Sequence, residues 1–462
     1  MDYQEFLKSK QIVIQTAGIN VKPSDINSIL FGFQRDITIW SLKKGRAAIF
    51  AGCGLGKTFM QLEWSRFVSG YVGGMVLIFA PLSVAAQTAD EGQKLGIDVA
   101  LCRSQDDCKP GINITNYEML EHFDLSQFAG LVLDESSILK SYSGAFRNRI
   151  IELSRNIPYL LACTATPAPN DYMELGNHAE FLGVMTRSEM LSMFFVHDGG
   201  DTQKWRLKGH AVKKFWEWVA SWAVMLQKPS GLGYSDDGFE LPPLNIEQIT
   251  VKVDKPNTGG LFAVEALTLQ ERQTARRETA KERAAACAEI VNQSDTSWIN
   301  WCNLNSESEL LTKLINGSVE IRGSDTNEKK KRVAKEFIAG LVKKLNSKPS
   351  IFGWGMNWQH CHNMTFVGLS DSFEELYQAV RRCWRFGQKN PVNVYIITSE
   401  TEGAVVANIK RKEADFERML SEMIAATQEI TKANIQATRR DVAEYNPRIE
   451  MIIPDWLKED AA

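Results

Sequence analysis

The chain has 462 residues, of which 44% are hydrophobic and 24% are charged, and its formal net charge at pH 7 is −3. This length and composition are typical of a globular protein with two or three domains, and the charge excludes a chain that binds polyanions through an overall basic excess. The longest apolar stretch, near residues 75–86, is interrupted by Pro81 and is too short to span a bilayer, and the first residues have no apolar core of a signal peptide. We therefore expect a cytoplasmic protein with no membrane segment, in which any site for a polyanion is a local cleft.

The first predicted element is a helix over residues 33–40, with Phe33, Ile37 and Trp40 on one face. Gln34 lies outside that face. A glutamine about twenty residues ahead of a phosphate-binding loop can recognise adenine, because its side-chain amide both donates and accepts hydrogen bonds. Alone, Gln34 indicates little, and its meaning depends on whether such a loop occurs later in the chain.

The second element is an apolar strand, residues 47–51, which leads through a glycine-rich turn into a helix that begins near Lys57-Thr58. The glycines of the turn are Gly52, Gly54 and Gly56. This order of strand, turn and helix predicts a phosphate-binding loop, in which backbone N–H groups surround phosphate oxygens, Lys57 contacts the β- and γ-phosphates and Thr58 ligates Mg²⁺. The strict motif has glycine where this chain has Ala51, so a glycine-rich turn with a chance Lys-Thr pair is the alternative.

Further apolar strands are predicted over residues 75–80, 98–102, 112–115, 130–134 and 158–163, separated by helical stretches. Continuous apolar strands that alternate with helices indicate a parallel sheet covered on both faces, so the predicted fold class is α/β. Such sheets bind ligands at the carboxyl ends of their strands.

Two of these strand ends carry polar residues. Asp134 and Glu135 follow one buried strand, where one carboxylate can hold Mg²⁺ and the other can orient and deprotonate an attacking water. Acids after a strand are often only solvated, but this pair occurs about eighty residues after the loop, and ATP hydrolysis needs the two parts together. The second end, Thr164-Ala165-Thr166-Pro167, is either an ordinary strand exit or a functional turn rich in hydroxyl groups.

From about residue 170 to residue 244 the alternation stops, and we predict a helical insertion followed by a linker. The segment holds Trp205, Trp216, Trp218 and Trp222 together with a basic run over residues 204–210. Aromatic residues at helical spacing form core more often than they stack on bases, so we favour a core role. The interleaved basic residues leave a nucleic-acid contact open.

A second α/β domain is predicted from residue 244, without a phosphate-binding loop of its own. Its predicted strands are residues 244–253, 298–302, 350–354, 364–369 and 392–397, and its predicted helices include residues 261–292 and 374–382. Arg381, Arg382 and Arg385 crowd the end of the last helix. They are either cations favoured by the helix dipole or arginine fingers directed at a nucleotide that the first domain holds.

In order and spacing, these segments resemble the superfamily-two helicases and, among them, the Swi/Snf-related DNA translocases. The segments that carry the resemblance are Gln34, residues 51–58, Ala80-Pro81-Leu82-Ser83 with Gln87 and Glu91, Asn116-Tyr117-Glu118, Asp134-Glu135, Thr164-Ala165-Thr166-Pro167, residues 355–359 and residues 378–388. The last segment is close to the Q-A-x-G-R-x-x-R-x-G-Q signature of that branch, with Arg381 for the usual glycine and Trp384 for the usual histidine. The match runs from near residue 30 to near residue 400 without the Trp-rich segment, and the compact size resembles phage or prophage forms.

The resemblance implies two RecA-like lobes in tandem with ATP between them. It predicts a first lobe over residues 1–175, the Trp-rich insertion and linker over 176–243, a second lobe over 244–425 and a tail over 426–462. It also implies ATP and Mg²⁺ as cofactors, double-stranded DNA as the partner, and the cytoplasm of a bacterial or phage-infected cell.

The resemblance further assigns roles to single residues. Gln34 would read adenine, the three loop glycines with Lys57 and Thr58 would hold the phosphates, Thr58 and Asp134 would ligate Mg²⁺, and Glu135 would activate water. Gln378, Arg382 and Arg385 would close on the nucleotide from the second lobe. Thr164, Thr166, Gly355 and Asn357 would couple the site to the nucleic acid.

Other classes of protein share some of these features. A packaging motor would share the loop and the carboxylates but should carry a nuclease domain of clustered acids, and a nucleotide kinase would not need a second sheet. An ATP-gated DNA clamp with little translocation should lack Glu135 or the arginines, and both are present. A conventional strand-separating helicase and an RNA helicase stay open, although the second domain has no clear candidate for a wedge hairpin.

Overall fold

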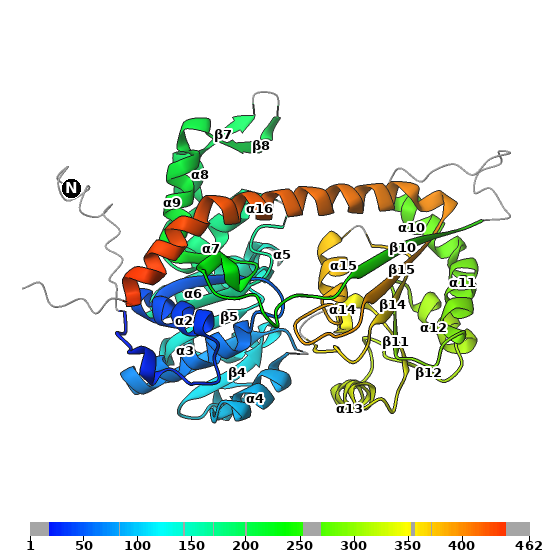
Figure 1. The fold of residues 1–462 in the computed structure, drawn as a ribbon, viewed down its shortest axis with the longest axis horizontal. Helices are drawn as coiled ribbons and strands as arrows, with labels where there is room; N and C mark the ends of the chain where they lie inside the picture. Colours follow the sequence, from blue (N-terminus) through cyan, green and yellow to red (C-terminus); the bar gives the residue numbers. More distant parts are fainter. Residues whose placement is uncertain are drawn as a thin grey trace, which may run out of the picture.

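The computed structural model of the chain describes residues 18–82, 84–141, 144–169, 171–198, 201–252, 269–352, 356–370 and 372–439. In this part of the chain the protein has a seven-stranded and a six-stranded parallel sheet, each covered by helices, and one two-stranded antiparallel hairpin (Figure 1). The predicted α/β class with parallel sheets is confirmed.

The first sheet has the strand order β3-β4-β2-β5-β6-β1-β9. Its strands are β1 (Arg46–Ala51), β2 (Met75–Ala80), β3 (Val99–Leu101), β4 (Ile112–Asn116), β5 (Phe128–Asp134), β6 (Tyr159–Thr164) and β9 (Ala223–Leu226). The central strands β2, β5 and β6 are buried along almost their whole length. Their continuous apolar sequences suit strands that helices cover on both faces.

The alternation of side chains along each strand decides which face of the first sheet a residue joins. On one face, Ile49 and Val132 pack in a core with α2 (Gly32–Lys44), α3 (Lys57–Val72) and α4 (Ala85–Lys94). On the other face, Phe50 and Leu133 pack with α6 (Gly144–Ser154) and α7 (Leu175–Phe181). We call this sheet with its helices, residues 18–232, the amino-terminal unit.

The Trp-rich segment belongs to this unit. It forms α8 (Arg187–Phe194), the hairpin of β7 (Phe195–Asp198) and β8 (Asp201–Leu207), α9 (Val212–Trp222) and the strand β9. Trp216 and Trp222 are buried in the same core as Phe50, which confirms the predicted core role.

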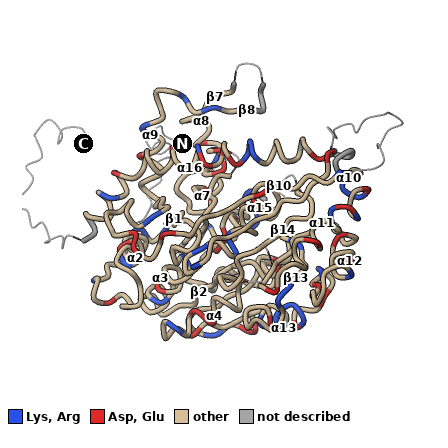
Figure 2. The backbone as a smooth tube through the Cα atoms, turned by 45° about the vertical axis from the view of Figure 1, so that its right-hand side comes forward, with Lys and Arg blue, Asp and Glu red and all other residues tan. Residues whose placement is uncertain are grey.

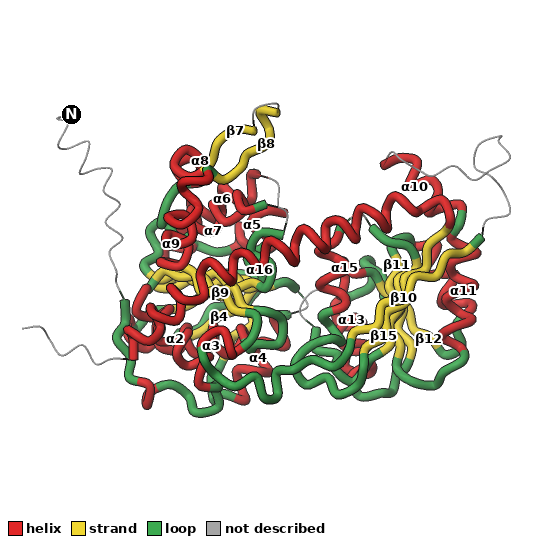
Figure 3. Tube along the Cα trace, turned by 45° about the horizontal axis from the view of Figure 1, so that its top comes forward, coloured by secondary structure: helices red, strands yellow, loops and turns green. Residues whose placement is uncertain are grey.

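The strand β9 differs from the predicted organisation, because it pairs with β1 at the edge of the first sheet. Part of residues 176–243, which the sequence assigned to an insertion and linker, therefore joins the first sheet, and of this segment the β7–β8 hairpin stands away from the sheet (Figures 1 and 3). The short strand follows α9 directly, so that helix and strand form one apolar run in the sequence and no turn signal separates them.

The second sheet has the strand order β10-β15-β14-β11-β13-β12. Its strands are β10 (Leu244–Val251), β11 (Trp298–Cys302), β12 (Ser318–Glu320), β13 (Lys344–Ser347), β14 (Asn363–Val367) and β15 (Val392–Ser399). Its helices are α10 (Leu269–Glu278), α11 (Ala280–Asn292), α12 (Asn305–Leu314), α13 (Asn327–Ile338), α14 (Pro349–Phe352) and α15 (Phe373–Val380). We call this sheet with its helices, residues 244–402, the carboxy-terminal unit.

Two predicted elements of this unit are wrong. Residues 349–352 form the helix α14 instead of a strand, and Pro349 suits the first turn of a helix. The strand of this region is β13, whose polar sequence is buried because Asn346 accepts a hydrogen bond from Asn300 Nδ2 at 2.9 Å and donates one to Ser318 Oγ at 3.1 Å. The helix predicted over residues 261–292 is divided into α10 and α11, and its residues before 269 lie outside the described part.

A last helix, α16 (Gly403–Arg439), returns from the carboxy-terminal unit to the amino-terminal unit (Figures 1 and 3). Its Ile409 and Phe416 belong to the core of the second sheet, whereas Met423 and Ile435 belong to the two cores of the first. The helix runs without a break past residue 425, where the sequence predicted the start of a tail. None of the helices in the described ranges is both long and apolar enough to cross a bilayer.

Candidate functional site

A cavity of about 190 Å³ lies between the two units. The amino-terminal unit lines it with Gln34, with the glycine-rich turn after β1 and with the acidic pair after β5. The carboxy-terminal unit lines it with Asn357, Arg382 and Arg385. The structure thus brings most of the predicted site residues together, although they come from segments hundreds of positions apart.

The glycine-rich turn leads from the end of β1 at Ala51 into α3, which begins at Lys57. Gly54 and Gly56 have φ angles of 86° and 77°, in the left-handed region that favours glycine. A Cβ atom at Gly56 would lie 2.2 Å from Gln34 Nε2, and one at Gly54 would lie 2.7 Å from the backbone nitrogen of Phe386. These glycines are required both by the turn and by the close approach of two other segments.

The start of α3 offers partners for an anion. The first N–H groups of a helix have no acceptor within the helix and carry its positive dipole end. Lys57 Nζ lies at the same place and donates to the carbonyl oxygen of Ala51 at 2.8 Å. Gly52 differs from the prediction, because its N–H donates to the carbonyl oxygen of Leu226 in β9 at 2.8 Å and so extends the sheet.

The acidic pair lies at the end of β5. Asp134 and Glu135 are 5% and 9% exposed, and Glu135 Oε2 is buried with no hydrogen-bond partner in the described part of the chain. Glu135 has a φ of 55° and is, among the described residues, the one non-glycine residue with a positive φ. Such a backbone costs of order 1–3 kcal/mol and persists where the surrounding structure holds it, often at functional sites.

Burial and then the neighbouring charge of Glu135 raise the pKa of Asp134 to about 7, although the Gln61 amide and the Lys57 ammonium act in the opposite direction. Two buried carboxylates beside one lysine would be relieved by a further cation. Carboxylate and hydroxyl oxygens are ligands that Mg²⁺ prefers, and both Asp134 and Thr58 line the cavity. The residues present therefore fit a magnesium ion held between them and phosphate oxygens.

Gln34 and three aromatic rings line another part of the cavity. The Gln34 side chain accepts a hydrogen bond from Phe31 N and donates one to the Leu55 carbonyl oxygen, both at 2.9 Å. One N–H and one acceptor position of the amide remain for a ligand. The rings of Phe239 and Phe386 are stacked with centroids 4.8 Å apart, and Phe31 meets Phe239 edge to face at 5.0 Å. The flat, apolar surfaces of these rings suit a heteroaromatic base.

The arginines of the carboxy-terminal unit follow α15. Arg382 is buried and donates to the carbonyl oxygen of Gln378 at 2.9 Å, to Gln378 Oε1 at 3.1 Å and to the Met356 carbonyl oxygen at 3.3 Å. Arg385 Nη1 donates to the same Met356 oxygen at 3.4 Å. Burial, followed by the charge of Arg385, lowers the pKa of Arg382 to about 10, and burial also lowers the pKa of Arg385. Both guanidinium groups are therefore charged in a place that favours an anion beside them.

The helix-capping alternative is met in part, because Arg382 donates to the carbonyl oxygen of Gln378 in the last turn of α15. Arg381 lies over the rings of Tyr377 and Trp384, at 5.0 and 4.2 Å, and does not line the cavity. Gln378 is wholly buried behind Arg382 and positions it, so the structure places Gln378 away from the cavity lining where the resemblance placed it.

The residues expected to couple the site to nucleic acid occupy different places. Thr164 and Thr166 are buried at the end of β6, where Thr166 N donates to Thr164 Oγ1 at 3.1 Å. Asn357 Nδ2 donates to Glu91 Oε1 at 3.2 Å and so links the two units at the cavity. Gly355 lies outside the described residues.

A second link between the units lies close to the acidic pair. Lys140 in α5 (Ile138–Ser141) forms a 2.8 Å ion pair with Glu374 at the start of α15, and both side chains are 12% exposed. Two polar contacts between side chains therefore join the units.

Sequence reasoning missed four contributors to the site. Phe31 and Phe239 line the cavity, and no pattern at their positions indicates it. Phe386 also lines it, inside the segment 378–388 that carries the resemblance, but no role was predicted for it. His178 of α7 is buried with its Nε2 atom 3.1 Å from Ser136 Oγ, next to Glu135. Burial lowers the pKa of His178 to about 4, nearby backbone carbonyl groups oppose this and the charge of Lys140 adds to it, so the ring is neutral. A single histidine without a motif gives no signal in the sequence.

No protein-family model matches this chain, and no curated protein matches it. The arrangement of residues in the cavity therefore carries the functional argument.

Proposed function

We propose that this protein is a nucleic-acid-stimulated ATPase, a motor of the helicase type that hydrolyses ATP between two RecA-like lobes and moves along double-stranded DNA. The observation that carries the proposal is the composition of one cavity. A glycine turn, Lys57 and the Asp134-Glu135 pair face it from one unit, and Arg382 and Arg385 face it from the other.

Each group has a role in phosphoryl transfer to water. The N–H groups at the start of α3 and the Lys57 ammonium bind the phosphates, and Gln34 binds the base. Asp134 and Thr58 would hold Mg²⁺, which when bound neutralises charge on the phosphates. Glu135, whose Oε2 is without a partner in the described structure, orients the attacking water and takes its proton. Arg385 meets the charge that develops in the transition state.

The cavity of about 190 Å³ is lined by both units, so a movement of one unit relative to the other would change its shape. The Glu91–Asn357 hydrogen bond and the Lys140–Glu374 ion pair are polar contacts that a separation of the units would break. Repeated closing and opening would move the contacts of the two lobes stepwise along a bound strand.

The choice of duplex DNA rests on the resemblance of residues 378–388 to the duplex-translocating branch. The fold agrees with it in one respect. Among the described residues the antiparallel hairpin belongs to the amino-terminal unit, so the carboxy-terminal unit presents no wedge hairpin there. Phosphate contacts position such a motor without reading base sequence.

The test is steady-state ATP hydrolysis with no nucleic acid and with duplex DNA, single-stranded DNA or RNA of equal length. We expect the largest stimulation with duplex DNA, independent of its sequence and falling steeply with salt. Hydrolysis that no nucleic acid stimulates would contradict the motor, and DNA binding without turnover would leave the ATP-gated clamp. Stimulation by RNA alone would contradict the branch assignment.

A second experiment separates duplex tracking from strand separation. With ATP, we expect displacement of the third strand from a DNA triplex and little unwinding of a forked duplex. Efficient fork unwinding without triplex displacement would assign the protein to the conventional strand-separating helicases instead.

A further inference from the structure

The backbone at Glu135 needs an anchor. Its left-handed φ of 55° is a conformation that a residue with a Cβ atom rarely adopts, and the carboxylate it directs into the cavity has an unpartnered oxygen in the described structure. If nothing held the turn, Glu135 would relax to an ordinary conformation and its carboxylate would leave its place.

Ser136 supplies the anchor, because it is fixed at two points. Its N–H donates to the carbonyl oxygen of Cys163 in β6 at 2.9 Å, continuing the β5–β6 pairing of Asp134 with Cys163. Its hydroxyl lies 3.1 Å from His178 Nε2. The Ser136 side chain is fully buried, so no water competes for this hydrogen bond.

His178 is itself held firmly. It lies in α7 with 2% exposure, and Phe50 of β1 meets its ring edge to face at a centroid distance of 5.1 Å. Phe50 in turn meets Trp222, the last residue of α9, at 6.1 Å. A rigid wall of three rings thus lies behind the hydroxyl of Ser136.

We propose that His178 is a positioning residue for the acidic pair. Through its hydrogen bond it holds Ser136 against the end of β6, and this keeps Glu135 in the left-handed turn that directs its carboxylate at the nucleotide. The proposal rests on the proposed function, in which Glu135 orients the attacking water.

The test compares His178→Leu, which fills similar space without a hydrogen bond, with His178→Gln, which can restore one. For His178→Leu we expect kcat to fall by about 10- to 100-fold, as for a misplaced catalytic group, with the KM for ATP nearly unchanged. His178→Gln should recover most of the lost rate. Ser136→Ala should fall to the level of His178→Leu, and the double variant should be no slower than either.

The matched control is Asn177→Ala, the neighbouring polar residue of α7. Its side chain accepts a hydrogen bond from Arg147 at 3.1 Å, away from Ser136, so this variant should lose stability without losing kcat. A folded His178→Leu protein with normal kcat would overturn the proposal. Equal loss of kcat in His178→Leu and His178→Gln would also overturn it, because the ring would then only fill space.

A readout that needs no turnover separates this inference from the proposed function. Hydrogen exchange at the Ser136 N–H should be slow in the wild type and in His178→Gln and faster in His178→Leu. Unchanged exchange in His178→Leu would refute the anchoring even in an active enzyme. Faster exchange in a protein that hydrolyses no ATP would support the anchoring and refute the proposed function alone.

Discussion

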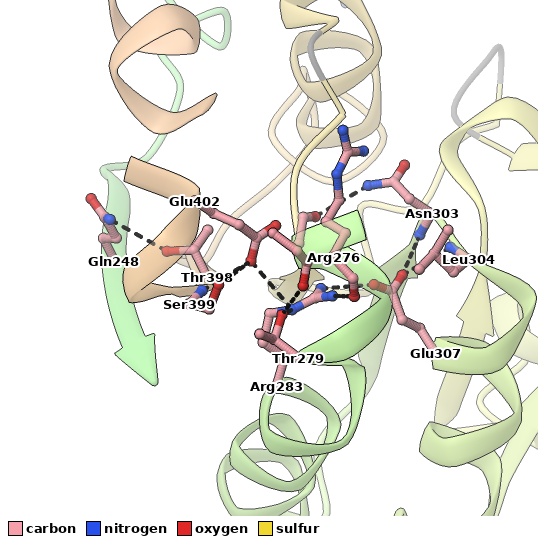
Figure 4. A network of polar contacts seen from close by, with 12 residues as sticks. Gln248, Arg276, Thr279, Arg283, Asn303, Leu304, Glu307, Thr398, Ser399 and Glu402 are labelled. Atoms are coloured by element: carbon pink, nitrogen blue, oxygen red, sulfur yellow. Dashed lines mark hydrogen bonds and ion pairs between the residues drawn. The ribbon is translucent and has the colours of Figure 1, made fainter. Parts of the chain in front are cut away.

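In the amino-terminal unit the carboxyl ends of β1 and β5 open onto the cavity, whereas in the carboxy-terminal unit the ends of β11, β14 and β15 are closed by a buried network of charges (Figure 4). Open parallel sheets bind ligands outside the carboxyl ends of their strands. One sheet keeps that place accessible, and the other fills it with its own side chains.

Arg283 of α11 is the centre of the network. It is wholly buried, its Nη1 atom lies 2.7 Å from Glu307 Oε1, and its Nε atom lies 3.3 Å from Glu402 Oε2. Glu307 also accepts from the N–H groups of Asn303 and Leu304 after β11, both at 2.9 Å. A Cβ atom at Gly368, after β14, would lie 2.3 Å from Arg283 Nη1, so glycine is needed for the guanidinium to fit.

The difference shows what decides the use of a parallel sheet. Glycines with positive φ and a helix start leave room for an anion in the first unit, while a guanidinium and two carboxylates take the equivalent room in the second. The carboxy-terminal unit meets the cavity with the amino ends of its strands. Its residues 356–359 and 381–388 precede β14 and β15 and therefore lie at the amino ends of these strands.

The largest effect is expected from removing the reactive groups at the carboxyl ends of β1 and β5. Lys57→Ala and Glu135→Gln should both abolish turnover, because one loses the phosphate contact and the other the group that orients water. Glu135→Gln should still bind a fluorescent ATP analogue, since its phosphate-binding turn is intact. Undiminished hydrolysis by Glu135→Gln would refute its catalytic assignment.

The next largest effect is expected from the arginines with which the carboxy-terminal unit lines the cavity. Arg385→Ala should lower kcat by about 10³-fold, as for arginine fingers, and should change ATP affinity little. Arg382→Ala should lower both kcat and the melting temperature, because Arg382 makes three hydrogen bonds inside its unit. Arg381→Ala, outside the cavity, is the control. Normal turnover with reduced stability in the Arg385 variant would favour helix capping after all.

The Arg283 network at the carboxyl ends of the second sheet should stabilise the fold without binding a ligand. Arg283→Met leaves two carboxylates buried without their cation and should cost about 3–5 kcal/mol of unfolding free energy. Binding of the fluorescent ATP analogue by folded protein should persist. Arg332→Met on α13, whose side chain is 69% exposed in an ion pair with Glu336, should cost less than about 1 kcal/mol. Denaturant unfolding followed by Trp fluorescence compares them. Lost ATP binding at full stability would show a ligand role for Arg283.

The buried His178 should make the stability of the protein depend on pH. Folding lowers the pKa of His178 from 6.5 to about 4, mainly through burial. Below pH 6.5 the unfolded chain takes up a proton that the folded chain refuses, so stability falls as the pH drops from 6.5 towards 4. The raised pKa of Asp134 acts in the opposite direction, because it increases stability as the pH drops. This contribution cancels when wild type and His178→Leu are compared, since both proteins contain Asp134.

The stability advantage of the wild type over His178→Leu should therefore shrink by up to about 3 kcal/mol between pH 7 and pH 4. Asn177→Ala, which removes a neighbouring side chain that does not titrate, should show no such window. Melting temperatures measured against pH decide this. A constant difference between wild type and His178→Leu would mean that the pKa of the histidine is the same in the folded and the unfolded protein.

The same contrast explains how far the sequence could predict the molecule. The strand, glycine turn and helix around Lys57 and the acids after β5 are local patterns, and the structure has them where they were predicted. The Arg283 network, the strand β13 and the contact of His178 with Ser136 depend on partners 24 or more positions away, through polar residues that have no periodicity. A pattern of neighbouring residues can be recognised in a single sequence. A buried arginine that fills the space at the carboxyl ends of a sheet cannot, because its partners are distant in the chain.

The smallest effect concerns the projecting part of the amino-terminal unit. Lys and Arg residues lie at the end of β8 and at the start of α9 (Figure 2). Of the run first considered for nucleic acid, Lys208 is engaged in the fold, because its Nζ donates to the carbonyl oxygens of Ser192 and Met193 at the end of α8. The side chain of Lys204 lies outside the described part. The exposed candidates are Arg206, Lys213 and Lys214.

If this surface contacts DNA, changing Arg206, Lys213 and Lys214 together to alanine should lower duplex affinity and flatten its salt dependence by up to roughly three units of slope, because each lost phosphate contact removes nearly one released counterion. A triple change of Lys331, Arg332 and Lys335 on α13 removes the same charge from the carboxy-terminal unit and is the control. Fluorescence anisotropy over a range of salt concentrations gives both slopes. Equal slopes in the two triple variants would mean that net charge alone acts, and an unchanged slope in the first would leave the hairpin region a structural role.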